Sequence, residues 1–200
     1  MRRADGGDEL SGLVGRAQAG DPAAVSDVIR QVRGRIFRYA MARIGTREEA
    51  EDVTQETCVA LADALPRFDG DAGRFTSFVF GIASNKVLMS QRARGRRPEV
   101  PVADIPEATS VSPGPLERAE REDELRGLLA RLESLPDRHR DVLLLRVVGE
   151  LSAEEVGEAL GTSAANVRVI QHRALSTLRA EISESDDATD NATDDSAKGE

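Results

Sequence analysis

Apolar residues between positions 20 and 45 recur every three or four residues, a spacing typical of an amphipathic α-helix. The clearest run has five members: Val25, Val28, Ile29, Val32 and Ile36. Asp21 and Pro22 precede this run as an N-cap and a proline at the first helical position, and Gly45 suits its end. The pattern therefore predicts one long helix over this segment.

Two more helices are predicted before residue 98. Thr46 and Glu49 have the spacing of a capping box, and the helix that they begin should stop at Pro66. A loop rich in glycine and aspartate at 69–73 leads into a segment without proline, which can be helical to about Arg94.

The third of these helices contains three of the six aromatic residues of the chain. Four of its apolar residues share one face of a helical wheel, which predicts that they pack in a core: Phe75, Phe78, Val79 and Ile82. Phe80 lies off that face, so it either contacts the preceding helices or forms an exposed platform.

The helical pattern breaks at residues 98–115, which contain five prolines, no aromatic residue and no apolar periodicity. Such a segment cannot build a core, so we expect an extended linker between two domains. Helical spacing resumes near Leu116 and continues to a break at Leu135-Pro136, and a further helix is predicted over 137–148.

The last part of the chain has the pattern of a helix-turn-helix. Ser152 and Glu155 form a second capping box, Gly161 marks a turn, and Ser163 can cap a final helix. The small Gly157 would let the two helices approach closely. The outer face of the final helix offers side chains that suit base edges and phosphates: Asn166, Arg168, Gln171, His172 and Arg173. The alternative is an ordinary two-helix corner with a solvated basic face.

No segment alternates like a β-strand, so the sequence predicts an all-α protein of two small helical domains joined by an extended linker. The predicted parts are a disordered N-terminus (1–9), a first domain (10–97), the linker (98–115), a second domain (116–182) and an acidic disordered tail (183–200).

Charge is distributed unevenly along the chain. The formal net charge is −9, yet residues 181–200 contain eight carboxylates against one lysine, and two stretches, 72–98 and 159–180, contain no acid at all. A surface from which every acid is missing suits a polyanion, and rings beside cations, as in the first stretch, also suit unpaired bases. These two stretches are the candidate nucleic-acid surfaces.

Several classes of protein are excluded by the sequence. No apolar run approaches the length of a membrane span and no secretory signal is present, so we expect a cytoplasmic protein. One cysteine and two histidines argue against a disulfide or a structural zinc site. Phosphate-binding loops and nucleophile motifs are absent, which predicts that the protein is not an enzyme and needs no cofactor or metal.

Two stretches resemble a known family. "AEDVTQETCVALADALPRF" followed by "FTSFVFGIASNKVLMSQRARGRR" resembles region two of the bacterial sigma-70 family, and "LPDRHRDVLLLRVVGELSAEEVGEALGTSAANVRVIQHRALSTLR" resembles its region four. Their order and the linker between them resemble the extracytoplasmic-function (ECF) group, and "VRVIQHRAL" is similar to actinobacterial sigma factor D-like members. The resemblance implies a factor that binds core RNA polymerase and directs promoter-specific transcription initiation.

The resemblance also implies roles for individual residues. The polymerase-binding residues would be Asp52, Gln55 and Glu56, which would dock on the large catalytic subunit. Those contacting the minus-ten promoter element and its melted non-template strand would be Phe80, Asn85, Lys86, Arg92, Arg94, Arg96 and Arg97. Those contacting the duplex of the minus-thirty-five element would be Ser163, Asn166, Arg168, Gln171, His172 and Arg173. The implied protein partners are the beta and beta-prime subunits of the polymerase and an anti-sigma factor.

The main alternative is a helix-turn-helix regulator that works without polymerase. Its first domain would sense a ligand or form a dimer, and it would bind duplex DNA tightly by itself. A second alternative is an adaptor that uses the acidic tail as a nucleic-acid mimic.

Overall fold

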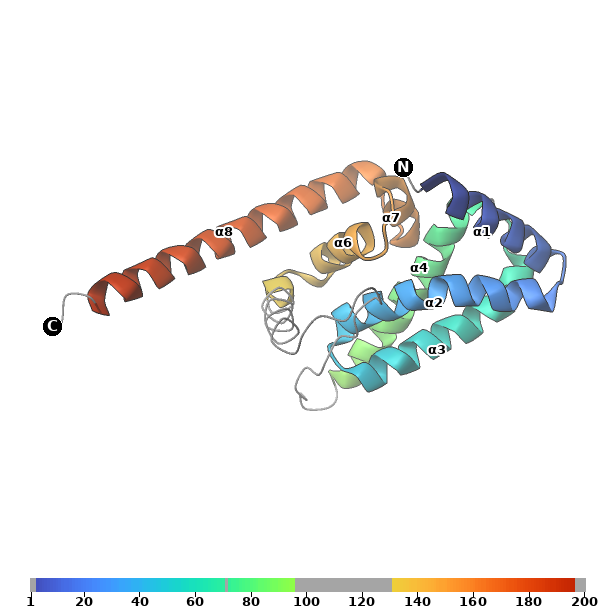
Figure 1. Cartoon of the computed structure of the whole chain (residues 1–200), viewed down its shortest axis with the longest axis horizontal. Coiled ribbons are helices and arrows are strands. Elements are labelled where there is room, and N and C mark those ends of the chain that lie inside the picture. The colour runs from blue at the N-terminus through green and yellow to red at the C-terminus, as the bar shows by residue number, and fades with distance from the viewer. Residues whose placement is uncertain (1–2, 71, 96–130, 197–200) are drawn as a thin grey trace.

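The computed structural model describes the backbone of residues 3–70, 72–95 and 131–196 (Figure 1). These ranges form helices joined by short turns and contain no strand, which confirms the all-α prediction. The first half comprises α1 (Arg3–Gln18), α2 (Pro22–Ile44), α3 (Arg47–Ala64), the short 3₁₀ helix η1 (Leu65–Arg67) and α4 (Ala72–Arg94). The second half comprises α6 (Asp137–Val147), α7 (Ala153–Ala159) and α8 (Ala164–Ser196). The predicted linker at 98–115 lies outside the described residues.

Both predicted ends of α2 are confirmed. The Asp21 carboxylate accepts hydrogen bonds from the amides of Ala23 and Ala24 at 2.9 and 3.2 Å. Gly45 has a φ of 81° and donates its amide to Met41. A left-handed glycine of this kind ends a helix because it has no Cβ to clash.

The capping box predicted at the start of α3 is wrong. Thr46 makes no side-chain hydrogen bond to the amides of α3. Its hydroxyl instead accepts from Arg94 at 2.7 Å, and Arg94 also pairs with Glu49. The Arg94 guanidinium of α4 therefore contacts Thr46 and Glu49, the two side chains that the local pattern predicted to cap α3 together.

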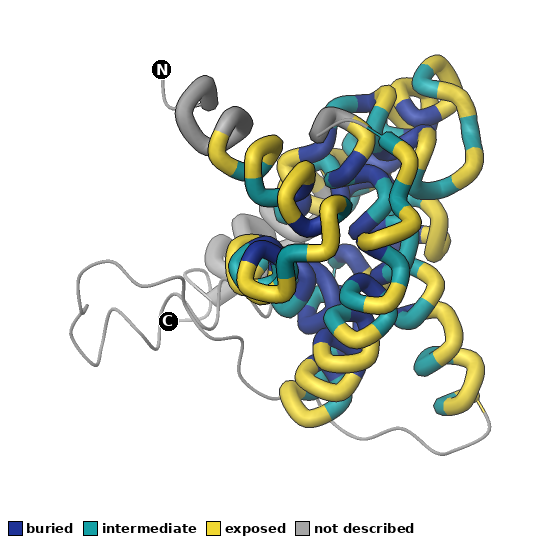
Figure 2. The backbone as a smooth tube through the Cα atoms, turned by 90° about the vertical axis from the view of Figure 1, so that its right-hand side faces the viewer, coloured by how far each residue is buried: buried dark blue, intermediate teal, exposed yellow. Residues whose placement is uncertain are grey.

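The core of the first half lies between α2, α3 and α4, where the largest fully buried side chains include Ile36, Tyr39, Leu61 and Phe75. Figure 2 shows buried residues along the inner sides of the helices and exposed ones outside. Phe80 belongs to this core because it is only 1% exposed and meets the Tyr39 ring edge to face at 5.9 Å. The exposed platform considered for Phe80 is therefore wrong.

The inward face of α4 also differs from the predicted one. It consists of Phe75, Val79, Phe80, Ala83 and Val87, all buried. Phe78 and Ile82 are only half-buried, and Phe78 packs against Phe68 with ring centroids 4.8 Å apart. Phe80 faces inward because α2 packs against that side of α4, where Tyr39 and Arg35 contact the Phe80 ring.

In the second half, Leu145, Val156, Val167 and Ala174 are fully buried and belong to the same hydrophobic cluster as the core of the first half. Ser152 and Glu155 form the predicted capping box. Gly161 has a φ of 63°, and the Ser163 hydroxyl accepts the amide of Asn166 at 3.2 Å, so the predicted turn and cap are also confirmed.

The two halves are in contact. α7 packs against α4, and α6 packs against α2. The C-terminal part of α8 projects away from the other helices (Figure 1).

Helix extends further toward both ends than the sequence predicted. α1 begins at Arg3, within the predicted disordered N-terminus, and α8 continues to Ser196, within the predicted disordered tail. No proline or glycine lies between positions 162 and 198, so nothing local interrupts α8. Among the helices described, none has the length and apolar character needed to cross a bilayer.

Candidate functional site

The first candidate surface is a groove along α3. All three predicted polymerase-binding residues, Asp52, Gln55 and Glu56, are exposed and line it. The groove has a volume of about 500 Å³, and Val59 in its wall is 58% exposed. An exposed valine between carboxylates suits a partner helix that offers both apolar and cationic side chains. We call this surface the α3 groove.

Lys86 lines the α3 groove, whereas the family resemblance assigns it to the minus-ten contacts. It reaches across from α4 and pairs with Glu56 at 3.1 Å. The structure therefore brings together one predicted DNA-binding residue and one predicted polymerase-binding residue.

The predicted minus-ten residues of α4 divide into two groups. Asn85 and Arg92 are exposed, so both are free to meet a partner. Arg94 is engaged within the protein, since it donates to the Ile44 carbonyl at 2.7 Å as well as to Thr46 and Glu49. Arg96 and Arg97 lie outside the described residues.

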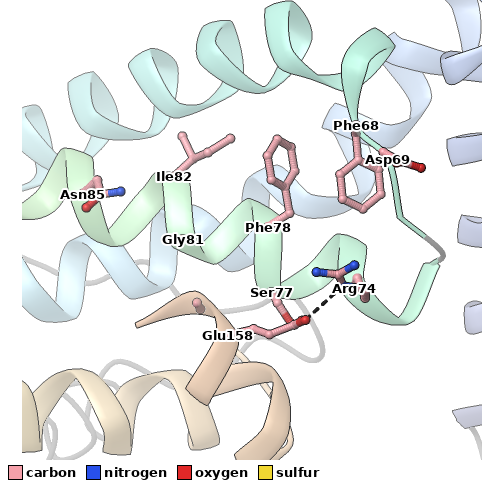
Figure 3. A pocket seen from close by; sticks show the side chains of 10 residues that line it. Phe68, Asp69, Arg74, Ser77, Phe78, Gly81, Ile82, Asn85 and Glu158 are labelled. Carbon is pink, nitrogen blue, oxygen red and sulfur yellow. Dashed lines mark hydrogen bonds and ion pairs between the residues drawn. The ribbon is translucent and has the colours of Figure 1, made fainter. Parts of the chain in front are cut away.

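A pocket of about 460 Å³ lies between α4 and α7 (Figure 3). Phe68, Phe78, Ile82 and Asn85 line one side of it, and Glu158 and Ala159 of α7 line the other. We call it the α4–α7 pocket. Phe68 is a residue that sequence reasoning missed, because its place beside Phe78 depends on the turn after η1. No local signal could have found it.

Polar groups in the α4–α7 pocket are arranged unevenly. Arg74 pairs with Glu158 at 2.9 Å, so α7 contributes a carboxylate to the pocket (Figure 3). The Ser77 hydroxyl is buried in the wall and has no hydrogen-bond partner among the described residues. A ring pair beside an amide and a free hydroxyl is a surface on which a nucleobase can stack and form hydrogen bonds.

The helix-turn-helix is built on close backbone packing. A Cβ atom at Gly157 would lie 2.7 Å from the carbonyl oxygen of Thr162, so only glycine allows α7 to approach the turn this closely. Val156 and Val167 are fully buried at the contact between the two helices. This arrangement turns one face of α8 outward.

That outward face bears the predicted minus-thirty-five residues. Five of the six are exposed: Ser163, Asn166, Arg168, His172 and Arg173. Gln171 is half-buried and accepts a hydrogen bond from Arg146 at 3.2 Å. Arg168 pairs with Glu154, whose pKa is lowered by a backbone hydrogen bond and by that guanidinium. An exposed pair of this kind breaks at little cost when a phosphate competes for the arginine.

The chain matches two family models. Sigma-70 region 2 matches residues 28–97, and sigma-70 region 4 matches residues 131–180. The chain is 42% identical over 180 residues to the ECF RNA polymerase sigma factor SigD of Mycobacterium tuberculosis, covering 88% of this chain and 85% of the relative. It is also 42% identical over 179 residues to the ECF RNA polymerase sigma factor ShbA of Streptomyces griseus, covering 86% and 94%.

A solved structure is also similar. CnrH, determined in complex with the cytosolic domain of CnrY, superimposes with a TM-score of 0.65 at 25% identity, covering 86% of this chain and 96% of that one. The chain therefore belongs to the sigma-70 family. Within that family it is an ECF sigma factor of SigD-like type, as the sequence resemblance predicted.

Proposed function

We propose that this ECF sigma factor binds core RNA polymerase through the α3 groove and reads promoter DNA through α4 and α8. As a member of its family it directs promoter-specific transcription initiation by RNA polymerase, and the polymerase-independent regulator is not favoured. Bond formation belongs to the polymerase, so the sigma factor contributes binding energy and the choice of start site. Its place of action is the cytoplasm, where polymerase and promoter DNA are found.

One observation carries the assignment of the duplex-reading surface. Asn166, Arg168, His172 and Arg173 are exposed on the outer face of α8, while Val167, Ile170 and Ala174 on the opposite face are buried. Residues 159–180 contain no acid, so this part of α8 can enter the major groove of the minus-thirty-five element without repelling the phosphates.

The minus-ten element is assigned to α4. Asn85 and Arg92 are exposed there, and the half-buried rings of Phe68 and Phe78 lie beside Asn85 in the α4–α7 pocket. We assign to these two rings the stacking role that Phe80, being buried, cannot perform. Capturing an extruded base offsets the several kcal/mol that unpairing and unstacking cost.

The partners follow from the same surfaces. The α3 groove would dock on the large catalytic subunit of the polymerase, and the beta and beta-prime subunits are the partners that the family resemblance implies. CnrH was solved bound to the cytosolic domain of CnrY, and by analogy we assign an anti-sigma partner to this chain.

Transcription by core polymerase supplemented with this chain tests the proposal. Arg173→Ala should reduce promoter-dependent transcript yield about tenfold at moderate salt, because one groove contact is lost. Polymerase binding should not change, since Arg173 lies outside the α3 groove. Arg179→Ala is the matched control, because Arg179 is exposed on the same helix but lies beyond the predicted contact residues.

Two results would contradict the proposal. Failure of the wild-type chain to bind core polymerase would contradict the assignment of the α3 groove as the polymerase-binding surface. Equal transcript yield from the Arg173 and Arg179 variants would remove the assignment of the duplex-reading face.

A further inference from the structure

One exposed apolar residue lies within the outward face of α8 and has no role in the proposed function. Val169 is 47% exposed, whereas the apolar residues around it in the chain, Val167, Ile170 and Ala174, are buried. Single exposed apolar side chains are common on protein surfaces, so exposure by itself requires no explanation. The position of Val169 on the helix does require one.

Helix geometry places Val169 among the residues assigned to DNA. Residues three and four positions apart are neighbours on the surface of a helix. By this rule the neighbours of Val169 are Ala165, Asn166, His172 and Arg173, and all four are exposed. Three of these neighbours are predicted minus-thirty-five residues. A face that enters the major groove with them therefore carries Val169 into the groove as well.

Val169 also faces away from the core of the helix-turn-helix. Successive residues of an α-helix are about 100° apart, so Val169 lies about 160° around α8 from Val167, which is fully buried. Arg168 lies about 100° from Val169 in one direction, and Arg173 lies about 40° from it in the other. Both arginines are exposed, so side chains that can reach phosphates flank the valine on both sides.

The chemistry of valine restricts what it can recognise in a major groove. Valine has no hydrogen-bond donor or acceptor, and thymine is the base that presents an apolar group there, its C5 methyl. Cytosine presents an amino group instead, which would lose its hydrogen bond to water against a valine and gain none. A valine at the centre of this face therefore favours thymine.

The side chain of Val169 is also nearly fixed before DNA binds. A β-branched residue has one strongly preferred rotamer in a helix, so its two methyl groups point in set directions. It therefore loses little conformational entropy on binding, unlike the long side chains of Arg168 and Arg173. This stiffness suits a residue that distinguishes bases by shape.

We propose that Val169 determines part of the sequence preference of this sigma factor by contacting the C5 methyl group of one thymine in the minus-thirty-five duplex. This inference rests on the proposed function of α8. The arginines of the same face supply affinity that falls with salt, because they displace counterions from the DNA. The methyl contact displaces water rather than ions, so the preference that it supplies does not depend on salt.

Removal of a single methyl group from the DNA tests the proposal. Deoxyuridine differs from thymidine only in lacking the C5 methyl, so the hydrogen-bonding groups of the base pair are kept. Holoenzyme is assembled from core polymerase and the full chain. A promoter from which wild type initiates is then prepared with each thymine of the upstream element, on either strand, replaced in turn by deoxyuridine. Binding is measured by competition at two salt concentrations.

We expect one of these replacements to weaken binding by wild-type holoenzyme about fourfold at both salt concentrations, which corresponds to the burial of one methyl group. Val169→Ala should bind thymine and deoxyuridine DNA equally at that position, because its shorter side chain does not reach the methyl group. Val147→Ala is the matched control. Val147 is 73% exposed but lies at the end of α6, so this variant should keep the fourfold difference.

Two results would overturn the role of Val169. One is that no deoxyuridine replacement weakens binding by wild type, a measurement that involves no change to the protein and hence no question of folding. The other is that Val169→Ala keeps the sensitivity of wild type. Both results leave the proposed function intact if Arg173→Ala still reduces transcription. If wild-type holoenzyme binds equally well when the whole upstream element is replaced by unrelated sequence, the proposed function of α8 itself fails.

Discussion

Gly157 illustrates what a single residue contributes to the helix-turn-helix. It is buried in α7, and a Cβ there would meet the Thr162 carbonyl oxygen at 2.7 Å and the Ala164 amide at 3.2 Å. Both neighbours are backbone atoms, so neither can rotate away as a side chain would. The angle between α7 and α8, and hence the outward face of α8, depends on the absence of that one carbon.

We therefore expect Gly157→Ala to lower the free energy of unfolding by about 1–3 kcal/mol, the usual cost of overpacking. Urea unfolding followed by circular dichroism measures this change. Gly12→Ala is the control, because Gly12 lies in α1 and a Cβ there would have no atom within 4 Å, so alanine should stabilise by up to about 1 kcal/mol. Equal effects of the two substitutions would contradict the role of close packing at Gly157.

At the scale of elements, the end of α4 locks the corner between α2 and α3. Arg94 donates to the Ile44 carbonyl and to Thr46 and pairs with Glu49, and Gln91 donates to the Arg43 carbonyl at 3.0 Å. The helix assigned to the minus-ten element is thus tied to the start of the helix that carries the α3 groove. Arg94 therefore connects the two helices, whereas the family resemblance assigns it to the minus-ten contacts.

Arg94→Ala and Arg92→Ala should separate these two roles. Arg94→Ala should cost about 1–3 kcal/mol of stability, because it removes charge-assisted hydrogen bonds from a partly buried corner. Arg92→Ala should leave unfolding unchanged, since Arg92 is exposed, and should weaken promoter binding with a salt slope smaller by about one. The measurements are urea unfolding and filter binding of the polymerase holoenzyme at several salt concentrations.

An Arg94→Ala variant that unfolds like wild type would overturn the positioning role of this residue. In that case the contacts of Arg94 would be incidental, and the residue would return to the set of DNA contacts.

At the scale of the whole molecule, charge is complementary across the contact between the halves. Cationic residues of α2 and α4, Arg43 and Arg74, face acidic residues of α6 and α7, Asp141 and Glu158. Arg35 of α2 also donates to the Gly149 carbonyl after α6. The net charge of the chain conceals this division, because the acids at its C-terminal end account for most of the excess.

Asp141→Asn should favour separation of the halves, because it leaves the buried Arg43 without its closest counter-charge. We expect a larger radius of gyration by X-ray scattering with unchanged helix content by circular dichroism. Glu154→Gln is the matched control, since it removes one carboxylate whose partner, Arg168, lies in the same half. A radius of gyration that is equal in both variants would contradict a role for Asp141 in holding the halves together.

The sequence by itself determined the features that depend on near neighbours along the chain. Helix periods, the caps at Asp21 and Ser152, the left-handed turns at Gly45 and Gly161, and the outward set on α8 all follow from residues a few positions apart. The family resemblance rests on the same local patterns.

Only the tertiary structure decided which side of α4 faces inward and which partners its polar residues take. Phe80 is buried because α2 lies against it, and Thr46 receives Arg94 rather than capping its own helix. Tyr39 meets Asp141 across 102 positions of sequence, and no periodicity can encode such a pairing. These contacts depend on how completed helices pack, so they are decided only after the local rules have been satisfied.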